Sequence, residues 1–216
     1  VIVALRSSGI NVIDVGTLTA PAFYFAQLYL KQVGGVMVTA SHNPFGWSGF
    51  KHLVDTLQTA TSVELKELQD IIANQDFAPG NGGLEERHDI IEAYASDILP
   101  RITVGRGLKV VVDAGNETAG LINPAILRRA GVEVIEQCTT VGAPCPHEPN
   151  PSTLEAMKHL AEKTKNVSVD LGVGYDADGD RAGFVDNTGN IIWPDQIAMI
   201  LARDILARYP NRSIVF

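Results

Sequence analysis

The chain has 216 residues, of which 45% are apolar and 19% are charged, and its mean hydropathy is +0.09. This composition is typical of a globular protein of one large or two small domains and excludes a disordered chain. No apolar run reaches the roughly 18 residues that a transmembrane helix needs, so we expect no membrane partner. The formal net charge of −8 disfavours nucleic acid as a partner. The low cysteine count favours a reducing, cytoplasmic location.

Residues 1–100 alternate between strand-like runs and helical patterns. Residues 1–8 are compatible with either a helix or a strand. Two apolar runs predict strands: residues 10–16 and 34–40. Three segments predict helices: residues 21–32, 62–74 and 89–99. Ser62 is the expected N-cap of the second helix. The apolar face of that helix carries Leu65, Leu68 and Ile72.

A break in the pattern near residue 100 predicts a domain boundary. Pro100 and the segment 105–107 interrupt the periodicity, and the valine run at 109–114 begins a strand of the kind that is covered on both faces. Further strands are expected at residues 132–138, 170–176, 181–186 and 213–216. Further helices are expected before Gly131 and at residues 152–165 and 195–208.

Alternating strands and helices predict an α/β protein of two consecutive domains with mainly parallel sheets. We assign residues 1–100 to the first domain and 101–210 to the second. The chain begins at Val1 and ends at Phe216 within apolar runs, so we expect it to be part of a longer protein.

A polar loop at residues 39–44 follows the strand expected before it and contains Ser41, His42 and Asn43. Ligands of open α/β sheets bind beyond the carboxyl ends of strands, so this serine could act as a nucleophile or a phosphoryl carrier. Lys51 could supply positive charge to a transferring phosphoryl group. From spacing alone, a polar turn whose side chains only satisfy the backbone is the stronger explanation.

Three aspartates alternate with small residues between two expected strands: Asp176, Asp178 and Asp180. Each buried charge needs a partner, so the three cannot all be core residues. Alternate residues of a curled loop face one side, which lets the carboxylates converge on a hard cation such as Mg²⁺ or Ca²⁺. The neighbouring Arg181 could bind a phosphate through its planar guanidinium. A solvated acidic turn is the alternative.

Together the two loops predict a phosphoryl-transfer site. No P-loop and no complete GxGxxG motif is present in the sequence, which disfavours a nucleoside triphosphate or a dinucleotide as the donor. Other residues are expected to be structural. We expect His147 to order its proline-rich loop, and Cys138 and Cys145, which form no zinc pattern with a histidine, to be small core or loop residues.

The segment GGVMVTASHNPFGWSGFK at 34–51 resembles the phosphoserine loop of the α-D-phosphohexomutases, the phosphoglucomutase and phosphomannomutase family. The segment GYDADGDR at 174–181 is similar to the metal loop of that family, in the same order along the chain. KVVVDAGNETAG at 109–120 and HEPNP at 147–151 extend the match. The resemblance implies four domains around a cleft, with residues 211–216 beginning the third.

The resemblance also implies a role for each site residue. Ser41 would be the phosphoserine, with His42 and Asn43 shaping its loop. Lys51 would assist proton transfer or balance charge, and Arg181 would lie near the phosphate. The implied ligands of Mg²⁺ are an oxygen of phosphorylated Ser41 and the carboxylates of Asp176, Asp178 and Asp180.

The implied reaction interconverts hexose 1-phosphate and hexose 6-phosphate of glucose or mannose. The enzyme phosphorylates a hexose monophosphate, and the bisphosphorylated sugar reorients and returns its other phosphoryl group to the serine. Hexose phosphate and hexose bisphosphate are therefore the expected partners. A phosphoglucosamine mutase, a metal-dependent phosphatase and an inactive piece that only binds metal or phosphate are the alternatives. We expect this chain alone to be inactive, and its oligomeric state stays open.

Overall fold

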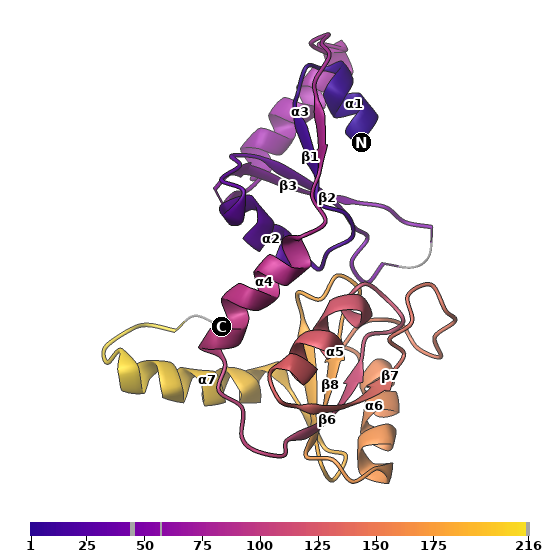
Figure 1. Ribbon diagram of the computed structural model, residues 1–216, viewed down its shortest axis with the longest axis vertical. Helices are drawn as coiled ribbons and strands as arrows, with labels where there is room; N and C mark the ends of the chain where they lie inside the picture. Colours follow the sequence, from indigo (N-terminus) through magenta and orange to yellow (C-terminus); the bar gives the residue numbers. More distant parts are fainter. Residues whose placement is uncertain (44–45, 57, 215–216) are drawn as a thin grey trace. The chain divides into compact units, whose positions relative to one another are not determined.

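The protein divides into two compact units, Val1–Ile102 and Thr103–Phe216, in a computed structural model that describes residues 1–43, 46–56 and 58–214 (Figure 1). Helices and strands alternate in both units, which confirms the predicted α/β class. The domain limits predicted at residues 100 and 210 stay predictions. None of the helices in the described part of the chain combines the length and hydrophobicity that crossing a membrane requires.

The first unit combines small sheets with the three helices predicted from the sequence and a short helix at its start. Its helices are α1 (Ile2–Ser7), α2 (Ala20–Tyr29), α3 (Ser62–Asn74) and α4 (Ile90–Ile98), followed by the 3-10 helix η1 (Leu99–Arg101). Strands β1 (Val12–Asp14) and β5 (Leu84–Glu86) pair in parallel. Strands β2 (Gly35–Val38), β3 (Phe50–Asp55) and β4 (Gln58–Thr59) form an antiparallel sheet.

The prediction of mainly parallel sheets is wrong for the first unit. Strands β2 and β3 are joined by residues 39–49, which is too short for the crossover of a dozen or more residues that a parallel pair needs. Met37 pairs with Lys51 and Val38 with Phe50, and the Thr39 N–H donates to Gly49 O at 3.0 Å. The segment with the candidate serine is therefore a hairpin connection held at both ends.

The N-cap of helix α3 is Thr61. The sequence predicted Ser62 as the N-cap, and this prediction is wrong. The Thr61 side chain accepts a hydrogen bond from the Val63 N–H, and the Glu64 carboxylate accepts one from the Thr61 N–H at 2.7 Å. Thr61 keeps extended backbone angles, whereas Ser62 is already helical. The apolar face predicted for this helix is exposed, with Leu65 at 43% and Ile72 at 56%.

The second unit is built on one mixed sheet with the strand order β10-β9-β8-β6-β7. Its strands are β6 (Lys109–Asp113), β7 (Glu133–Gln137), β8 (Leu171–Tyr175), β9 (Ala182–Asp186) and β10 (Ile191–Ile192). Its helices are α5 (Ala119–Arg129), α6 (Leu154–Asn166) and α7 (Pro194–Arg208). The central strand β6 pairs in parallel with β7 and β8, whereas β8, β9 and β10 pair antiparallel.

Helices cover both faces of this sheet (Figure 1). Val111 packs with Met157 and Leu160 of α6, whereas Val110 packs on the opposite face, in a cluster with Leu127 of α5. Successive residues of a strand point to opposite faces, so the uninterrupted valine run fits burial on both sides. The parallel strands place the segments that follow β6, β7 and β8 at one edge of the sheet.

Helix α7 presents apolar side chains to solvent. Ile200 and Leu201 of this helix are 62% and 56% exposed. After this helix, residues 211–214 form neither helix nor strand, so the strand predicted at 213–216 is not seen in its described half. Residues 215 and 216, like Pro44 of the serine loop, lie outside the described residues.

The close approach of α6 to β8 depends on glycine. A Cβ atom at Gly172 would overlap Thr164 Oγ1 and lie 2.9 Å from Leu160 Cδ1. We expect Gly172→Ala to lower the free energy of unfolding by about 1–3 kcal/mol, because the packed helix has little room to move. Urea unfolding followed by circular dichroism measures this loss.

Gly105→Ala is the matched control. A Cβ atom there meets no described heavy atom within 4 Å, and the residue has no left-handed backbone angle. Its effect should stay within about 0.5 kcal/mol. Equal stability of the two variants would contradict the glycine requirement at residue 172.

Candidate functional sites

Ser41 lies just beyond the carboxyl end of β2, as the sequence predicted. Its φ angle of +50° is in the left-handed region, which costs free energy for a residue with a Cβ atom. The Ser41 N–H donates to Thr39 Oγ1 at 2.9 Å, and Ser41 Oγ lies 3.4 Å from His42 Nδ1. This half-buried serine is therefore held in one orientation by its own loop.

The other predicted residues of this loop support its shape. The backbone N–H of Asn43 and its side-chain Nδ2 donate to Ala40 O at 3.0 and 2.8 Å. A Cβ atom at Gly49 would lie 2.9 Å from Thr39 O, so only glycine allows the two sides of the hairpin to approach this closely. Lys51 is half-buried on β3, so Ser41, His42, Asn43 and Lys51 all belong to one hairpin.

The three predicted aspartates converge in the tight turn between β8 and β9. One carboxylate oxygen from each of Asp176, Asp178 and Asp180 lies within 4.8 Å of the other two. Asp176 is fully buried and Asp178 is 3% exposed, whereas Asp180 is exposed. Gly179 closes the turn with a φ of +70° and donates its N–H to Asp176 O at 3.1 Å.

The electrostatics of this turn favour a bound cation. Burial, together with the charges of Asp178 and Asp180, raises the pKa of Asp176, although hydrogen bonds from Arg181 oppose this effect. The Arg181 N–H and Nε donate to the two Asp176 oxygens at 2.9 and 3.0 Å. Arg181 is therefore a partner of Asp176 in this structure, and its predicted place near a phosphate stays a prediction.

A hard divalent cation fits the donors of this turn. The three groups are carboxylates, and oxygen ligands of this kind suit Mg²⁺ rather than a soft metal ion. A divalent charge would offset the mutual repulsion of two buried carboxylates and their neighbour. The alternative of a fully solvated acidic turn does not fit the burial of Asp176 and Asp178.

His147 orders its loop, as the sequence predicted. Its side chain is only 4% exposed and lies between Asp113 Oδ2, 3.0 Å from Nε2, and Glu148 O, 2.9 Å from Nδ1. Burial raises the pKa of the Cys138 thiol to about 12, so without a bound metal ion this thiol stays protonated. The sequence did not predict that Cys138 and Cys145 lie beside His147.

Comparison with known proteins identifies the family. The family description "Phosphoglucomutase/phosphomannomutase, alpha/beta/alpha domain I" matches residues 1–79, and the corresponding description of domain II matches residues 92–189. The chain belongs to the phosphoglucomutase/phosphomannomutase family. The resemblance found in the serine and aspartate loops is therefore confirmed.

Individual relatives agree with this assignment. A phosphomannomutase/phosphoglucomutase of Pseudomonas aeruginosa is 39% identical over 213 residues, or 98% of this chain. A phosphoglucomutase of Neisseria gonorrhoeae is 35% identical over 215 residues, or 98% of this chain. The crystal structure of a phosphoglucomutase/phosphomannomutase family protein of Burkholderia thailandensis matches 95% of this chain with a TM-score of 0.88 and 32% identity. This chain spans 46% of the length of each of these proteins.

The aspartate turn can be tested by metal binding. We expect Asp178→Asn to weaken the binding of Mg²⁺ by at least about tenfold, because one of the converging charges is lost. Isothermal titration calorimetry of the reduced chain measures the affinity. The control Asp76→Asn changes an exposed aspartate outside the turn and should bind Mg²⁺ like the unchanged chain. The same affinity in both variants would exclude Asp178 as a ligand.

Proposed function

We propose that this chain carries the phosphoserine and the metal-binding loop of a phosphohexomutase that interconverts hexose 1-phosphate and hexose 6-phosphate. The observation that carries the proposal is the convergence of three aspartates in one turn. The chain that contains this turn and the serine hairpin belongs to the phosphoglucomutase/phosphomannomutase family. The names of the Pseudomonas and Neisseria relatives support glucose and mannose phosphates as the substrates. This substrate choice is preferred over a glucosamine phosphate.

Ser41 is the phosphoryl carrier in this proposal. A sugar hydroxyl takes the phosphoryl group as the P–O bond to Oγ breaks, the proton of that hydroxyl ends on the released Oγ, and a hexose bisphosphate forms. After the sugar reorients, its other phosphoryl group returns to Oγ, so the phosphoserine is regenerated. The left-handed backbone of Ser41 and the bond of its N–H to Thr39 Oγ1 support a hydroxyl fixed for this transfer.

The other residues of the hairpin shape the site and balance its charge. Asn43 braces the turn through its two hydrogen bonds to Ala40 O, and His42 lies beside the serine oxygen. Lys51 would either balance the negative charge of the transferring phosphoryl group or assist the proton transfer. Because phosphoserine is a dianion, cationic and hydrogen-bonding neighbours stabilise it.

Asp176, Asp178 and Asp180 would hold Mg²⁺, with an oxygen of phosphorylated Ser41 as a further ligand implied by the family. When bound, the ion supplies positive charge that stabilises the transferring phosphoryl group. The aspartates fix the ion, and Arg181 keeps Asp176 oriented through its hydrogen bonds and through a 2.9 Å ion pair. The same guanidinium would bind phosphate in the working enzyme. Two free thiols support the cytoplasmic location that is part of this proposal.

The serine assignment predicts where the chain accepts a phosphoryl group. After incubation with Mg²⁺ and glucose 1,6-bisphosphate, we expect the unchanged chain to gain one phosphoryl group and Ser41→Ala to gain none. Alanine keeps the Cβ atom and removes the hydroxyl, which is the group that would carry the phosphoryl group. Intact mass and mapping of the peptide that contains residue 41 measure the result.

The control for this experiment is Ser48→Ala, which removes an exposed serine from the same connection. It should accept the phosphoryl group as the unchanged chain does. Equal phosphorylation of Ser41→Ala and the control would overturn the assignment. If neither the unchanged chain nor the control is phosphorylated although Mg²⁺ is bound, the result would show that binding of the bisphosphate donor needs segments beyond this chain.

A further inference from the structure

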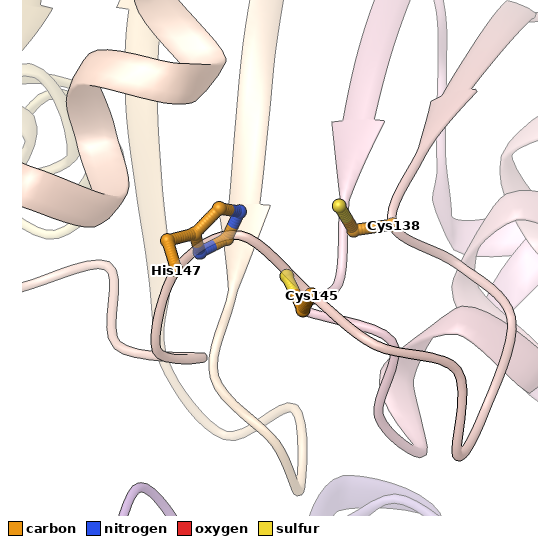
Figure 2. A group of neighbouring side chains, drawn as sticks. All are labelled: Cys138, Cys145 and His147. Carbon is orange, nitrogen blue, oxygen red and sulfur yellow. The ribbon is translucent and has the colours of Figure 1, made fainter.

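The second unit contains a second group of side chains that could hold a metal ion, drawn in Figure 2. Cys138 directly follows β7, and Cys145 and His147 belong to the proline-rich segment. A sulfur or ring nitrogen from each of the three lies within 4.8 Å of the other two. The chain has two cysteines, and Figure 2 shows both of them in this group with His147.

Asn116 holds the segment between the two cysteines in place. Its backbone N–H donates to Cys138 O at 2.6 Å, its Oδ1 accepts from the Thr140 N–H at 3.0 Å, and its Nδ2 donates to Pro144 O at 2.8 Å. Asn116 is itself 7% exposed and has a φ of +60°. Both ends of the segment are thus tied to one buried residue, which keeps the two thiols close without a disulfide bond between them.

His147 has the kind of hydrogen-bond acceptors that support metal-binding histidines. Such a histidine uses one ring nitrogen for the metal and donates the other N–H to a carboxylate or a backbone carbonyl. Here Asp113 Oδ2 faces Nε2 and Glu148 O faces Nδ1, so a metal ion at one nitrogen would replace the contact of that nitrogen, while the other nitrogen keeps its acceptor. The ring also stacks on His159, with centroids 5.2 Å apart. Its position is therefore fixed on several sides.

We propose that Cys138, Cys145 and His147 bind Zn²⁺, with water at the fourth position. Neighbouring ligands of a tetrahedral zinc ion lie about 3.3–3.8 Å apart, so small rotations of the thiols complete the geometry. Sulfur and imidazole ligands select Zn²⁺, whereas the carboxylates of the acidic turn select Mg²⁺. Both thiols give up a proton on coordination, and the two thiolates balance the charge of the ion.

Bound zinc would join the end of β7 to the proline-rich segment. Both thiols are half-buried, whereas the Asp113 and His147 side chains are almost fully buried. An ion that binds the folded chain and not the unfolded chain stabilises the folded state. Bound zinc would therefore strengthen the loop connections at this edge of the sheet. This inference does not depend on the proposed mutase activity.

Titration of the reduced full chain with Co²⁺ in excess Mg²⁺ tests the proposal. Because the chain has two cysteines, a thiolate-to-Co²⁺ charge-transfer band reports this group alone. We expect the band to saturate at one ion per chain and to disappear when Zn²⁺ displaces Co²⁺. Absence of the band at saturating Co²⁺ overturns the proposal, and so does a stoichiometry above one thiolate-bound ion.

Single variants identify the ligands. Cys138→Ser and Cys145→Ser should each weaken Zn²⁺ binding, measured by competition with a chromophoric chelator, more than about 100-fold. His147→Gln should weaken it as well, with folding checked by circular dichroism. Asp178→Asn should leave the band unchanged, since it alters only the acidic turn. Retention of full affinity in a folded cysteine or histidine variant overturns the assignment.

Discussion

The parallel pairing of β6 with β7 and β8 is the constraint on which the candidate sites of the second unit depend. Asp113, the last residue of β6, pairs with Gln137 of β7 and with Gly174 of β8. In-register parallel strands end together, so the segments that follow all emerge at one edge. The valine run of β6 makes this pairing stable because both its faces are covered by helices. One hydrophobic strand therefore gathers polar groups that are far apart in the sequence.

Two buried carboxylates at this edge are satisfied in different ways. Asp113 accepts hydrogen bonds from Gln137 Nε2 at 2.7 Å and lies 3.0 Å from His147 Nε2. Asp176 has a cationic partner in Arg181 but also faces two further carboxylates. A buried charge that is matched by nearby donors is structural, whereas a surplus of negative charge in one turn calls for a cation. This difference in local charge separates the structural aspartate from the candidate metal ligands.

The serine hairpin shows how far the sequence predicts a site. Its position after β2 followed from a local change from apolar to polar residues, and the structure has it there. The antiparallel partner β3 was not predicted, because Lys51 and His52 interrupt its apolar pattern. The left-handed angle of Ser41 also depends on tertiary contacts, since Gly49 must approach Thr39 closely from the opposite side of the hairpin.

The sequence by itself determined the α/β class, most helices and the two loops that reveal the family, because periodicity and contiguous motifs are encoded within short segments. The tertiary structure decided the antiparallel pairing in the first unit and the grouping of Cys138, Cys145 and His147. No zinc pattern connects these three residues in sequence. Asn116 holds the segment between the two cysteines through hydrogen bonds across more than twenty residues, and such long-range contacts leave no periodic signal in a single sequence.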